Sequence, residues 1–306
     1  MKIGFIGLGI MGKPMSKNLI KAGYELVVCG NIAKGPVEEL VAAGAKAAGT
    51  PAQVAEQADL LITMLPNSPQ VKEVVLGKNG ILESARSGTI FVDMSSIAPL
   101  VSRELAARLA EKGVEMLDAP VSGGEPKAIA GTLAVMVGGK RNVFEKCLPV
   151  LKAMASSVVL AGDIGAGNVT KLANQVIVAL NIAAMSEAFV LATKAGVSPD
   201  LVFQAIRGGL AGSAVLDAKA PLVMDRKFNP GFRINLHIKD LNNALETGHE
   251  IGVPLPLTAA VMEMMQTLKV EGLADLDHSA MVQYFEKLAN FEVKVAERGA
   301  PAPREK

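Results

Sequence analysis

Four polar side chains stand at helical spacing near the start of an apolar stretch between residues 166 and 195. They are Asn168, Lys171, Asn174 and Gln175. Residues three and four apart share a face of a helix, so the four side chains should converge. An ammonium group among amides is expensive to desolvate unless it has partners or a chemical task. For an arbitrary lysine the simpler interpretation is a solvated edge, or a stem that snorkels to water, so the rest of the chain must decide.

A glycine-rich turn near the amino end has the residue types that phosphate groups require. It follows an apolar strand at residues 2–6 and precedes a helix-like run at 13–22. Its first glycine permits a tight turn, its second lets backbone amides approach a pyrophosphate, and its third lets helix and strand pack closely. The helix amino terminus adds partial positive charge. The pattern predicts dinucleotide binding by Gly7, Leu8, Gly9, Ile10, Met11 and Gly12.

The end of the second strand, at residues 25–29, should contact the adenosine ribose of the dinucleotide. An acidic residue there favours NAD, but this chain has Gly30 and Asn31, with Lys34 nearby. It places no carboxylate for the ribose hydroxyls and no arginine for a 2′-phosphate. We expect NAD or NADP as cofactor, with Asn31 and Lys34 tilting the choice slightly toward NADP and dual use left open.

Three further residues follow strands at their carboxyl ends, where ligands bind in open parallel sheets. Leu65 and Pro66 come after the strand at 60–64, and Ser96 comes after the strand at 90–93. They are candidate walls of a nicotinamide pocket. An ordinary turn or helix cap is the alternative at each position.

A serine and two glycines follow the next strand, which ends at Asp118. In Ser122, Gly123 and Gly124 the backbone amides could point at an anion such as a substrate carboxylate. Taken alone, these three residues favour the simpler interpretation of a plain turn.

The elements that carry these residues change character near Gly162. Before it, strands and helices alternate, which predicts a parallel sheet with helical crossovers. After it come a long helix at 166–195 and further helices at 200–207, 236–248, 258–268 and 278–296. We therefore expect an α/β protein in which a long interdomain helix joins an N-terminal Rossmann-type doubly wound sheet to an all-helical C-terminal domain. The expected parts are 1–162 (dinucleotide-binding), 163–296 (helical, for substrate and oligomerisation) and 297–306 (a disordered tail).

Composition narrows the class of protein. The 306 residues are 50% hydrophobic and 20% charged, with a net charge of +1 and no basic run, which excludes a typical nucleic-acid-binding protein. Two distant cysteines and the absence of a signal-peptide pattern favour a cytoplasmic protein with reduced thiols. Ser186 and Glu187 interrupt the long apolar helix, so we expect no membrane span. The apolar helical half favours a homo-oligomer, a dimer or tetramer.

Four separated segments together resemble one family, the β-hydroxyacid dehydrogenases, which includes 3-hydroxyisobutyrate and tartronate semialdehyde reductases. The segments are residues 5–18 with the glycine turn, 118–124 (Asp-Ala-Pro-Val-Ser-Gly-Gly), 165–175 with Lys171, and 239–241 (Lys-Asp-Leu). The resemblance extends to about residue 295. Residues 176–188 are most similar to tartronate semialdehyde reductases.

The resemblance implies a role for each segment. Lys171 would be the general acid and base of a hydride transfer between a nicotinamide cofactor and an aldehyde or hydroxyl carbon. Ser122, Gly123 and Gly124 would bind the substrate carboxylate, and Asn174 and Gln175 the reacting oxygen or hydroxyl. Lys239 would lie near the cofactor, and no metal is expected. Some relatives have asparagine where Gln175 stands.

The implied reaction is the reversible NAD(P)H-dependent reduction of tartronate semialdehyde to glycerate, in glyoxylate metabolism. The alternatives within the family are a 3-hydroxyisobutyrate dehydrogenase and a succinic semialdehyde reductase that forms 4-hydroxybutyrate. A non-catalytic dinucleotide-binding module is disfavoured, because such a module has no need of Lys171.

Overall fold

The computed structural model describes residues 1–30 and 34–294 and divides the chain into two compact units, Met1–Leu172 and a second unit from Ala173 onward. The sequence placed the division at residue 162. The observed division falls inside the long helix α9 (Ala166–Lys194), because hydrogen bonds hold its first turn to the strands of the first unit. The predicted tail at 297–306 lies outside the described residues.

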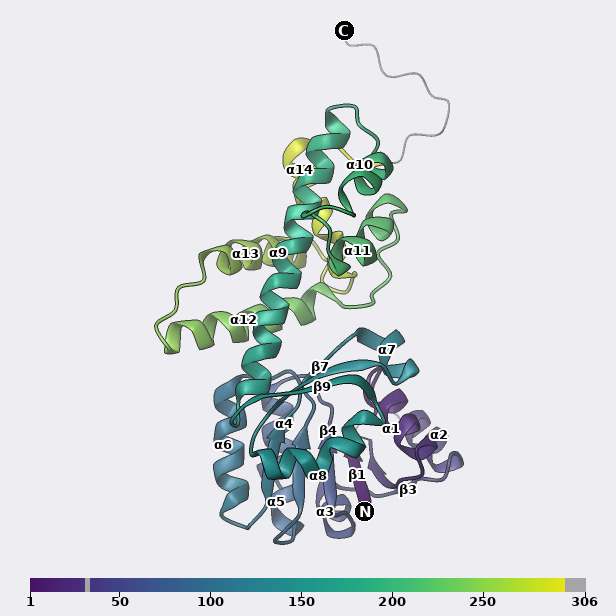
Figure 1. Cartoon of the computed structure of the whole chain (residues 1–306), viewed down its shortest axis with the longest axis vertical. Helices are drawn as coiled ribbons and strands as arrows, with labels where there is room; N and C mark the ends of the chain where they lie inside the picture. The colour runs from purple at the N-terminus through teal and green to yellow at the C-terminus, as the bar shows by residue number, and fades with distance from the viewer. Residues whose placement is uncertain (31–33, 295–306) are drawn as a thin grey trace. The chain divides into compact units, whose positions relative to one another are not determined.

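The first unit contains a mixed sheet with helices on both faces (Figure 1). The described strands are β1 (Lys2–Ile6), β2 (Glu25–Cys29), β3 (Lys46–Ala47), β4 (Leu60–Thr63), β5 (Ile90–Asp93), β6 (Glu115–Asp118), β7 (Val121–Ser122), β8 (Leu133–Gly138) and β9 (Ala155–Gly162). The helices between them are α1 (Gly12–Lys21), α2 (Lys34–Ala42), α3 (Pro51–Gln57), α4 (Ser68–Leu76), α5 (Ile81–Ser84), α6 (Pro99–Ala110), α7 (Gly124–Ala130) and α8 (Arg141–Lys152).

The strand order, β3-β2-β1-β4-β5-β6-β8-β7 with β9 beside β8, confirms the doubly wound arrangement. The chain winds in one direction from β1 to β3 and in the other from β4 to β6, so the order reverses between β1 and β4. Pairing is parallel through β6, but β8 runs antiparallel to both β6 and β7. The sequence expectation of a parallel sheet is therefore wrong where β8 meets β6 and β7, and it holds again between β8 and β9.

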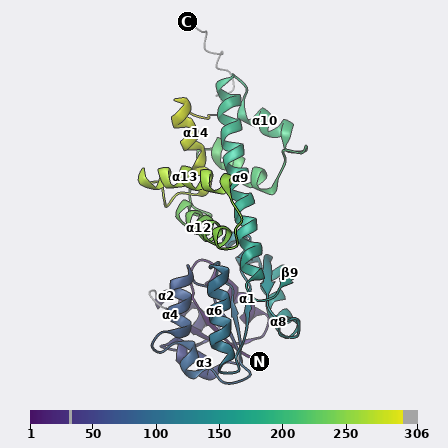
Figure 2. The ribbon, with the colours of Figure 1, turned by 90° about the vertical axis from the view of Figure 1, so that its left-hand side faces the viewer.

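Two apolar clusters fill the two faces of this sheet, and helices α6 and α8, labelled in Figure 2, belong to opposite faces. Along β2, Leu26 and Val28 belong to one cluster and Val27 and Cys29 to the other, as the two-residue period of a strand requires. Helices α1, α2, α7 and α8 cover the first face, and α3 to α6 cover the second. Cys147 of α8 lies in the first cluster, so the two buried free thiols sit on opposite faces of the sheet.

The second unit is helical over its described residues, as the sequence predicts. After α9 it contains α10 (Pro199–Ile206), α11 (Ala214–Met224), α12 (Ile234–Glu250), α13 (Pro256–Val270), a 3-10 turn η1 (His278–Met281) and α14 (Val282–Ala289). One cluster of side chains from these helices forms its core. The helix predicted at 278–296 is shorter than expected, because Asn290 adopts a left-handed conformation (φ 46°) and ends α14.

Helix α9 is the one helix of the described chain whose length and composition would let it cross a membrane, with a mean hydropathy of 1.9 in its most apolar window. The core helix of a soluble protein can meet the same criteria. Several of its apolar residues, including Ile182 and Phe189, lie in the core of the second unit. Its polar residues Asn168, Lys171 and Gln175 are buried.

Candidate active site

The glycine turn joins β1 to α1 at the reversal of strand order, where open α/β sheets bind ligands. Gly7 has a φ of 98°, and a Cβ there would overlap the carbonyl oxygen of Met64. A Cβ on Gly12 would overlap the carbonyl oxygen of Gly7. Both glycines are therefore required by the fold of the turn itself.

Gly9 differs from its neighbours in the turn, because a Cβ on Gly9 would have no described atom within 4 Å. Helix α1 begins three residues later, with no side-chain cap and no acidic residue in its first turn. An open glycine before an uncapped helix amino terminus fits a phosphate group, which the helix charge attracts. Beside this space Ile10 is largely exposed. The predicted residues 7–12 thus form a cradle that suits a dinucleotide.

The candidate nicotinamide walls are held by a small network beneath them. Thr63 and Asp93 are register partners at the ends of β4 and β5, and Thr63 Oγ1 donates to Asp93 Oδ1 over 2.8 Å. Ser95 N–H donates to the same oxygen over 3.0 Å, and Leu65 N–H donates to Ser95 Oγ over 2.9 Å. The loops that carry Leu65, Pro66 and Ser96 are therefore fixed side by side at the carboxyl edge of the sheet.

Asp93 is a buried carboxyl group that sequence reasoning did not assign. Burial raises its pKa to about 6, against the opposing donors from Ser95 and Thr63, and the nearby charge of Asp118 raises it further. Its Oδ2 has no hydrogen-bond partner among the described residues. The available signal was an acidic residue ending an otherwise apolar strand, in Ile90–Asp93.

Lys171 lies in the second turn of α9 and is buried, with 6% of its surface exposed. The start of α9 is bound to the end of β6, since Asp118 accepts hydrogen bonds from backbone N–H groups of Gly165 and Asn168, each over 2.7 Å. Burial raises the pKa of Asp118, and these donors oppose that effect. The burial of Lys171 rules out the simpler interpretation of a lysine at a solvated edge.

The candidate carboxylate loop is more structured than the sequence suggests. Ser122 ends the short strand β7 and pairs with Ala134 of β8, Gly123 is the N-cap of α7, and Gly124 is the first residue of that helix. Asn18 Nδ2 of α1 donates to the carbonyl of Ala128 in α7 over 2.7 Å. The helix that follows the glycine turn is thus bonded to the helix that follows the carboxylate loop.

In the second unit, Asn174 and Gln175 belong to a buried polar network. Asn174 Nδ2 donates to Gln175 Oε1 over 2.9 Å, and Gln175 Nε2 donates to Asp240 Oδ2 over 2.6 Å. Lys239 forms an ion pair with Asp240 Oδ1 at 2.9 Å. Asp240 therefore connects the predicted amides of Asn174 and Gln175 to Lys239. No role was predicted for Asp240 from the sequence.

His237 is bonded to the backbone of this network at Gln175. Its Nε2 lies 3.1 Å from the carbonyl oxygen of Gln175, which can only accept, so Nε2 carries the proton and donates. Its Nδ1 lies 2.9 Å from Nδ1 of His278, and Phe232 packs on both rings. The backbone of α9 at Gln175 is thereby tied to α12 within the second unit.

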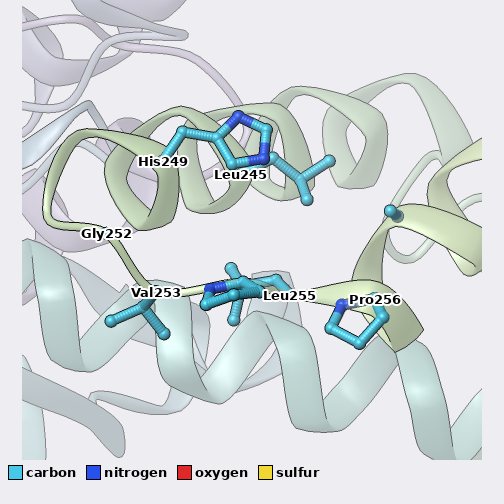
Figure 3. Close-up of a pocket in the computed structure, with 8 residues that line it drawn as sticks. Leu245, His249, Gly252, Val253, Leu255 and Pro256 are labelled. Atoms are coloured by element: carbon cyan, nitrogen blue, oxygen red, sulfur yellow. The ribbon is translucent and has the colours of Figure 1, made fainter.

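An apolar groove of about 630 Å³ lies where α12 turns into α13 (Figure 3). It is lined by Leu245, His249, Gly252, Val253, Pro254, Leu255, Pro256 and Ala259. It contains none of the predicted site residues and no cluster of donors or acceptors that could orient a hydroxyacid. We therefore do not assign the substrate to this groove, and the predicted residues remain the candidate site. Asn31 and the side chain of Lys34 lie outside the described residues, so the ribose contact stays a prediction.

The comparisons with known proteins agree with this fold. Residues 2–162 match the NAD-binding domain of 6-phosphogluconate dehydrogenase, and residues 165–285 match the NAD-binding family model of NADP-dependent 3-hydroxyisobutyrate dehydrogenase. Together the two models span most of the described chain, and both describe nicotinamide-dinucleotide enzymes.

Individual relatives are similar along most or all of their length. Escherichia coli 2-hydroxy-3-oxopropionate reductase is 46% identical over 294 residues, covering 96% of this chain and 100% of that protein. Rat mitochondrial 3-hydroxyisobutyrate dehydrogenase is 36% identical, covering 94% of this chain and 88% of that protein. The structure of Mycobacterium tuberculosis 3-hydroxyisobutyrate dehydrogenase with L-serine has a TM-score of 0.85 and 34% identity, covering 92% and 98% of the two chains.

The fold and these matches define an oxidoreductase that uses a nicotinamide dinucleotide. More particularly, the chain belongs to the β-hydroxyacid dehydrogenases, the family of 3-hydroxyisobutyrate dehydrogenase and 2-hydroxy-3-oxopropionate reductase.

Proposed function

We propose that this enzyme reduces tartronate semialdehyde (2-hydroxy-3-oxopropanoate) to glycerate, reversibly, with NADPH or NADH. The observation that carries the choice of substrate is the 46% identity, over 96% of this chain and 100% of the other, to the E. coli enzyme named for this reaction. The buried Lys171 carries the choice of chemistry, because an ammonium group in a partly desolvated position is suited to proton transfer.

A bound nicotinamide cofactor supplies the hydride. The residues of the glycine turn hold its phosphates, with Gly9 leaving the space and α1 the partial charge. Ser122 and the amides of Gly123 and Gly124 orient the substrate carboxylate.

Lys171 gives a proton to the aldehyde oxygen during reduction, and takes it back from the hydroxyl during oxidation. Positioned proton transfer of this kind contributes about 10²–10⁴-fold to a rate. Asn174 binds the substrate hydroxyl or reacting oxygen. Gln175, whose amide is bonded to Asp240 and Asn174, keeps Asn174 in place and completes the same polar surface.

The test is a substrate panel measured as kcat/KM with both NADH and NADPH. It compares tartronate semialdehyde, methylmalonate semialdehyde and succinate semialdehyde. A site that bonds a substrate hydroxyl rejects analogues that lack it, so tartronate semialdehyde should be preferred by about 10²-fold or more. A preference for methylmalonate semialdehyde would instead support the second candidate, a 3-hydroxyisobutyrate dehydrogenase, which the rat and mycobacterial relatives favour.

The same panel decides the cofactor. We propose NADPH as the preferred donor, because no carboxylate follows β2 in the sequence and Asn31 and Lys34 stand there instead. A kcat/KM higher with NADH than with NADPH would overturn this part of the proposal and leave the reaction itself unaffected.

We also propose that the enzyme works as a homo-oligomer, a dimer or tetramer. In the second unit the apolar side chains of Ile177, Leu191 and Leu257 are each at least 60% exposed, and an interface between subunits would bury them. Light scattering at micromolar protein should give a multiple of the 31.8 kDa chain mass. A monomeric mass would contradict this.

A further inference from the structure

One carboxylate, that of Asp118, binds the residue before α9 and a residue of its first turn. Its Oδ1 accepts from Gly165 N–H and its Oδ2 from Asn168 N–H, each over 2.7 Å, and the residue is fully buried. A negative charge at a helix amino terminus is stabilising, and two short charge-assisted hydrogen bonds fix its direction as well. Asp118 is therefore a cap supplied from a distant strand.

Two glycines bring α9 unusually close to the strands that carry this cap. A Cβ on Gly138, at the end of β8, would lie 2.7 Å from the backbone nitrogen of Gly167 and 2.8 Å from that of Ala166. A Cβ on Gly167 would lie 2.5 Å from the carbonyl oxygens of Asp118 and Met136. A side chain at either glycine would push the helix away. The first turn of α9 can therefore pack this closely on β6 and β8 only with glycine at both positions.

Asn168 adds two more attachments to the same turn. Its Oδ1 accepts from Ile97 N–H, and its Nδ2 donates to Ser102 Oγ, each over 3.1 Å. The first turn of α9 is thus tied to β6, to the loop after β5 and to α6. Lys171 follows Asn168 by three residues, on the same helix face and about 4.5 Å further along the axis.

Asp118 also begins the segment that leads to the carboxylate loop. Ser122 follows it by four residues, and Ala119 N–H donates to the carbonyl of Asp93 over 2.7 Å, which fixes the start of that segment. The same residue therefore anchors the helix that carries Lys171 and the loop that leads to Ser122–Gly124.

We infer that Asp118 is a positioning residue for proton transfer, which sets the place of the Lys171 ammonium relative to a substrate carboxylate held by residues 122–124. The inference rests on the proposed function, in which these groups act on one substrate. A substitution far from the reacting atoms that displaces a catalytic group by about 1 Å can lower the rate by about 10²-fold. Substituting Asp118 should thus lower kcat through Lys171 and leave cofactor affinity unchanged.

A double-mutant cycle separates positioning from a merely structural role. Asp118→Asn keeps the size of the side chain and one acceptor oxygen, but places an amide NH₂ against a backbone donor. In the enzyme with Lys171 it should lower kcat about 10- to 100-fold with a small change in KM. In the Lys171→Ala background it should lower the residual kcat by less than about threefold, because the group it positions is gone.

Equal fold-losses in the two backgrounds would overturn the inference. Asp200→Asn, a matched change in the first turn of α10, should leave kcat unchanged in both backgrounds. NADPH binding by fluorescence and the thermal midpoint verify that each variant is folded. If Asp118→Asn does not fold, Gly167→Ala, which moves the helix and keeps the carboxylate, and the milder Ser102→Ala decide the question by the same cycle.

The cycle also distinguishes this inference from the proposed function. If Lys171→Ala alone retains kcat, the proposed chemistry fails. If Lys171→Ala loses kcat and the effects of the two substitutions multiply, the chemistry stands and only the positioning role of Asp118 fails.

Discussion

Asp93 and Asp118 are register partners at the carboxyl ends of the adjacent parallel strands β5 and β6. Both are fully buried, and burial raises the pKa of each. They differ in what they hold: Asp93 organises the loops beside the predicted nicotinamide pocket, and Asp118 caps the helix that carries Lys171. Their proximity makes the charge of each one a cost to the other.

Asp93 should make the protein less stable as the pH rises from about 4 to about 7. Its pKa is raised in the folded state from 3.8 to about 6, so the folded protein binds more protons than the unfolded chain in this window. The contribution of Asp93 to the free energy of unfolding is fully present below pH 3.8 and is lost as the pH rises through 6. The difference between the two pKa values of Asp93, 3.8 and about 6, corresponds to about 3 kcal/mol of stability as an upper bound.

Asp93→Asn should remove this dependence, since the amide oxygen can still accept from Thr63 and Ser95 and no charge forms. Thermal midpoints measured from pH 4 to pH 7 should converge at the acid end and favour the variant at the neutral end. Parallel curves for the two proteins would show that Asp93 does not titrate in this range.

Gly9→Ala should fold normally and bind NADPH poorly. The added Cβ meets no described atom within 4 Å, so the thermal midpoint should stay close to that of the parent, but it occupies the space proposed for the pyrophosphate. We expect the Kd for NADPH to rise by about tenfold or more, at about 1.4 kcal/mol for each factor of ten.

The controls for Gly9 are two other glycines. Gly12→Ala should destabilise the first unit, because its Cβ overlaps the carbonyl of Gly7. Gly208→Ala, also in open space but in the second unit, should change neither stability nor binding. Tight NADPH binding by Gly9→Ala would place the phosphates elsewhere.

Lys171→Ala should lower kcat by about 10²–10⁴-fold and leave NADPH affinity largely intact. Lys171→Arg separates proton transfer from charge, because an arginine keeps the positive charge and cannot give up its proton in a protein. We expect the arginine variant to be nearly as slow as the alanine variant in steady-state assays. An arginine variant with substantial kcat would assign Lys171 an electrostatic role only.

Lys219→Met should destabilise the second unit by up to about 3–5 kcal/mol, because it removes the lysine that pairs with a buried carboxylate. Lys219 Nζ lies 2.9 Å from Asp277 Oδ1, and Asp277 is fully buried. Burial alone would raise the pKa of Asp277, but the charges of His278 and Lys219 and several backbone donors lower it to about 2.

This contribution has the opposite pH sign to that of Asp93. It is present above pH 3.8 and is lost as the pH falls toward 2, so the penalty of Lys219→Met should be largest near neutrality and shrink in acid. Chemical denaturation at pH 7 and pH 3 measures it. The double variant Lys219→Met/Asp277→Asn should recover part of the loss, and a penalty independent of pH would contradict the ion pair.

Local signals in the sequence were sufficient where a short segment determines its own conformation. The strand, glycine turn and helix at residues 2–21 were found because every feature lies within one βα unit. The long helix α9 was found because nearly thirty residues without proline leave few alternatives.

Elements that depend on distant partners were missed. Helix α7 was expected to be a loop, because Gly123, Gly124 and Pro126 indicate a turn; the bond from Asn18 supports it from another helix. Helix α11 was missed because Pro221 lies within it and a glycine-rich stretch precedes it. The antiparallel direction of β8 has no local signature, since buried strands read alike in either direction.

The same reasoning divides the candidate site. Lys171 and the glycines were identified by type and spacing. Asp93, Asp118 and Asp240 act through partners tens of residues away, so their roles became visible only with the pairing of β5 and β6 and the packing of α12 in three dimensions.

The two thiols on opposite faces of the sheet provide the protein with a native probe of its own opening. Burial raises the pKa of both Cys29 and Cys147, the latter to about 12, so neither is a reactive thiolate in the closed state at neutral pH. Alkylation must await exposure, and the chain has no other cysteine. The rate of alkylation can be measured at each cysteine separately by mass spectrometry. The two rates would therefore report how fast the helices on each face of the sheet open, without an introduced label.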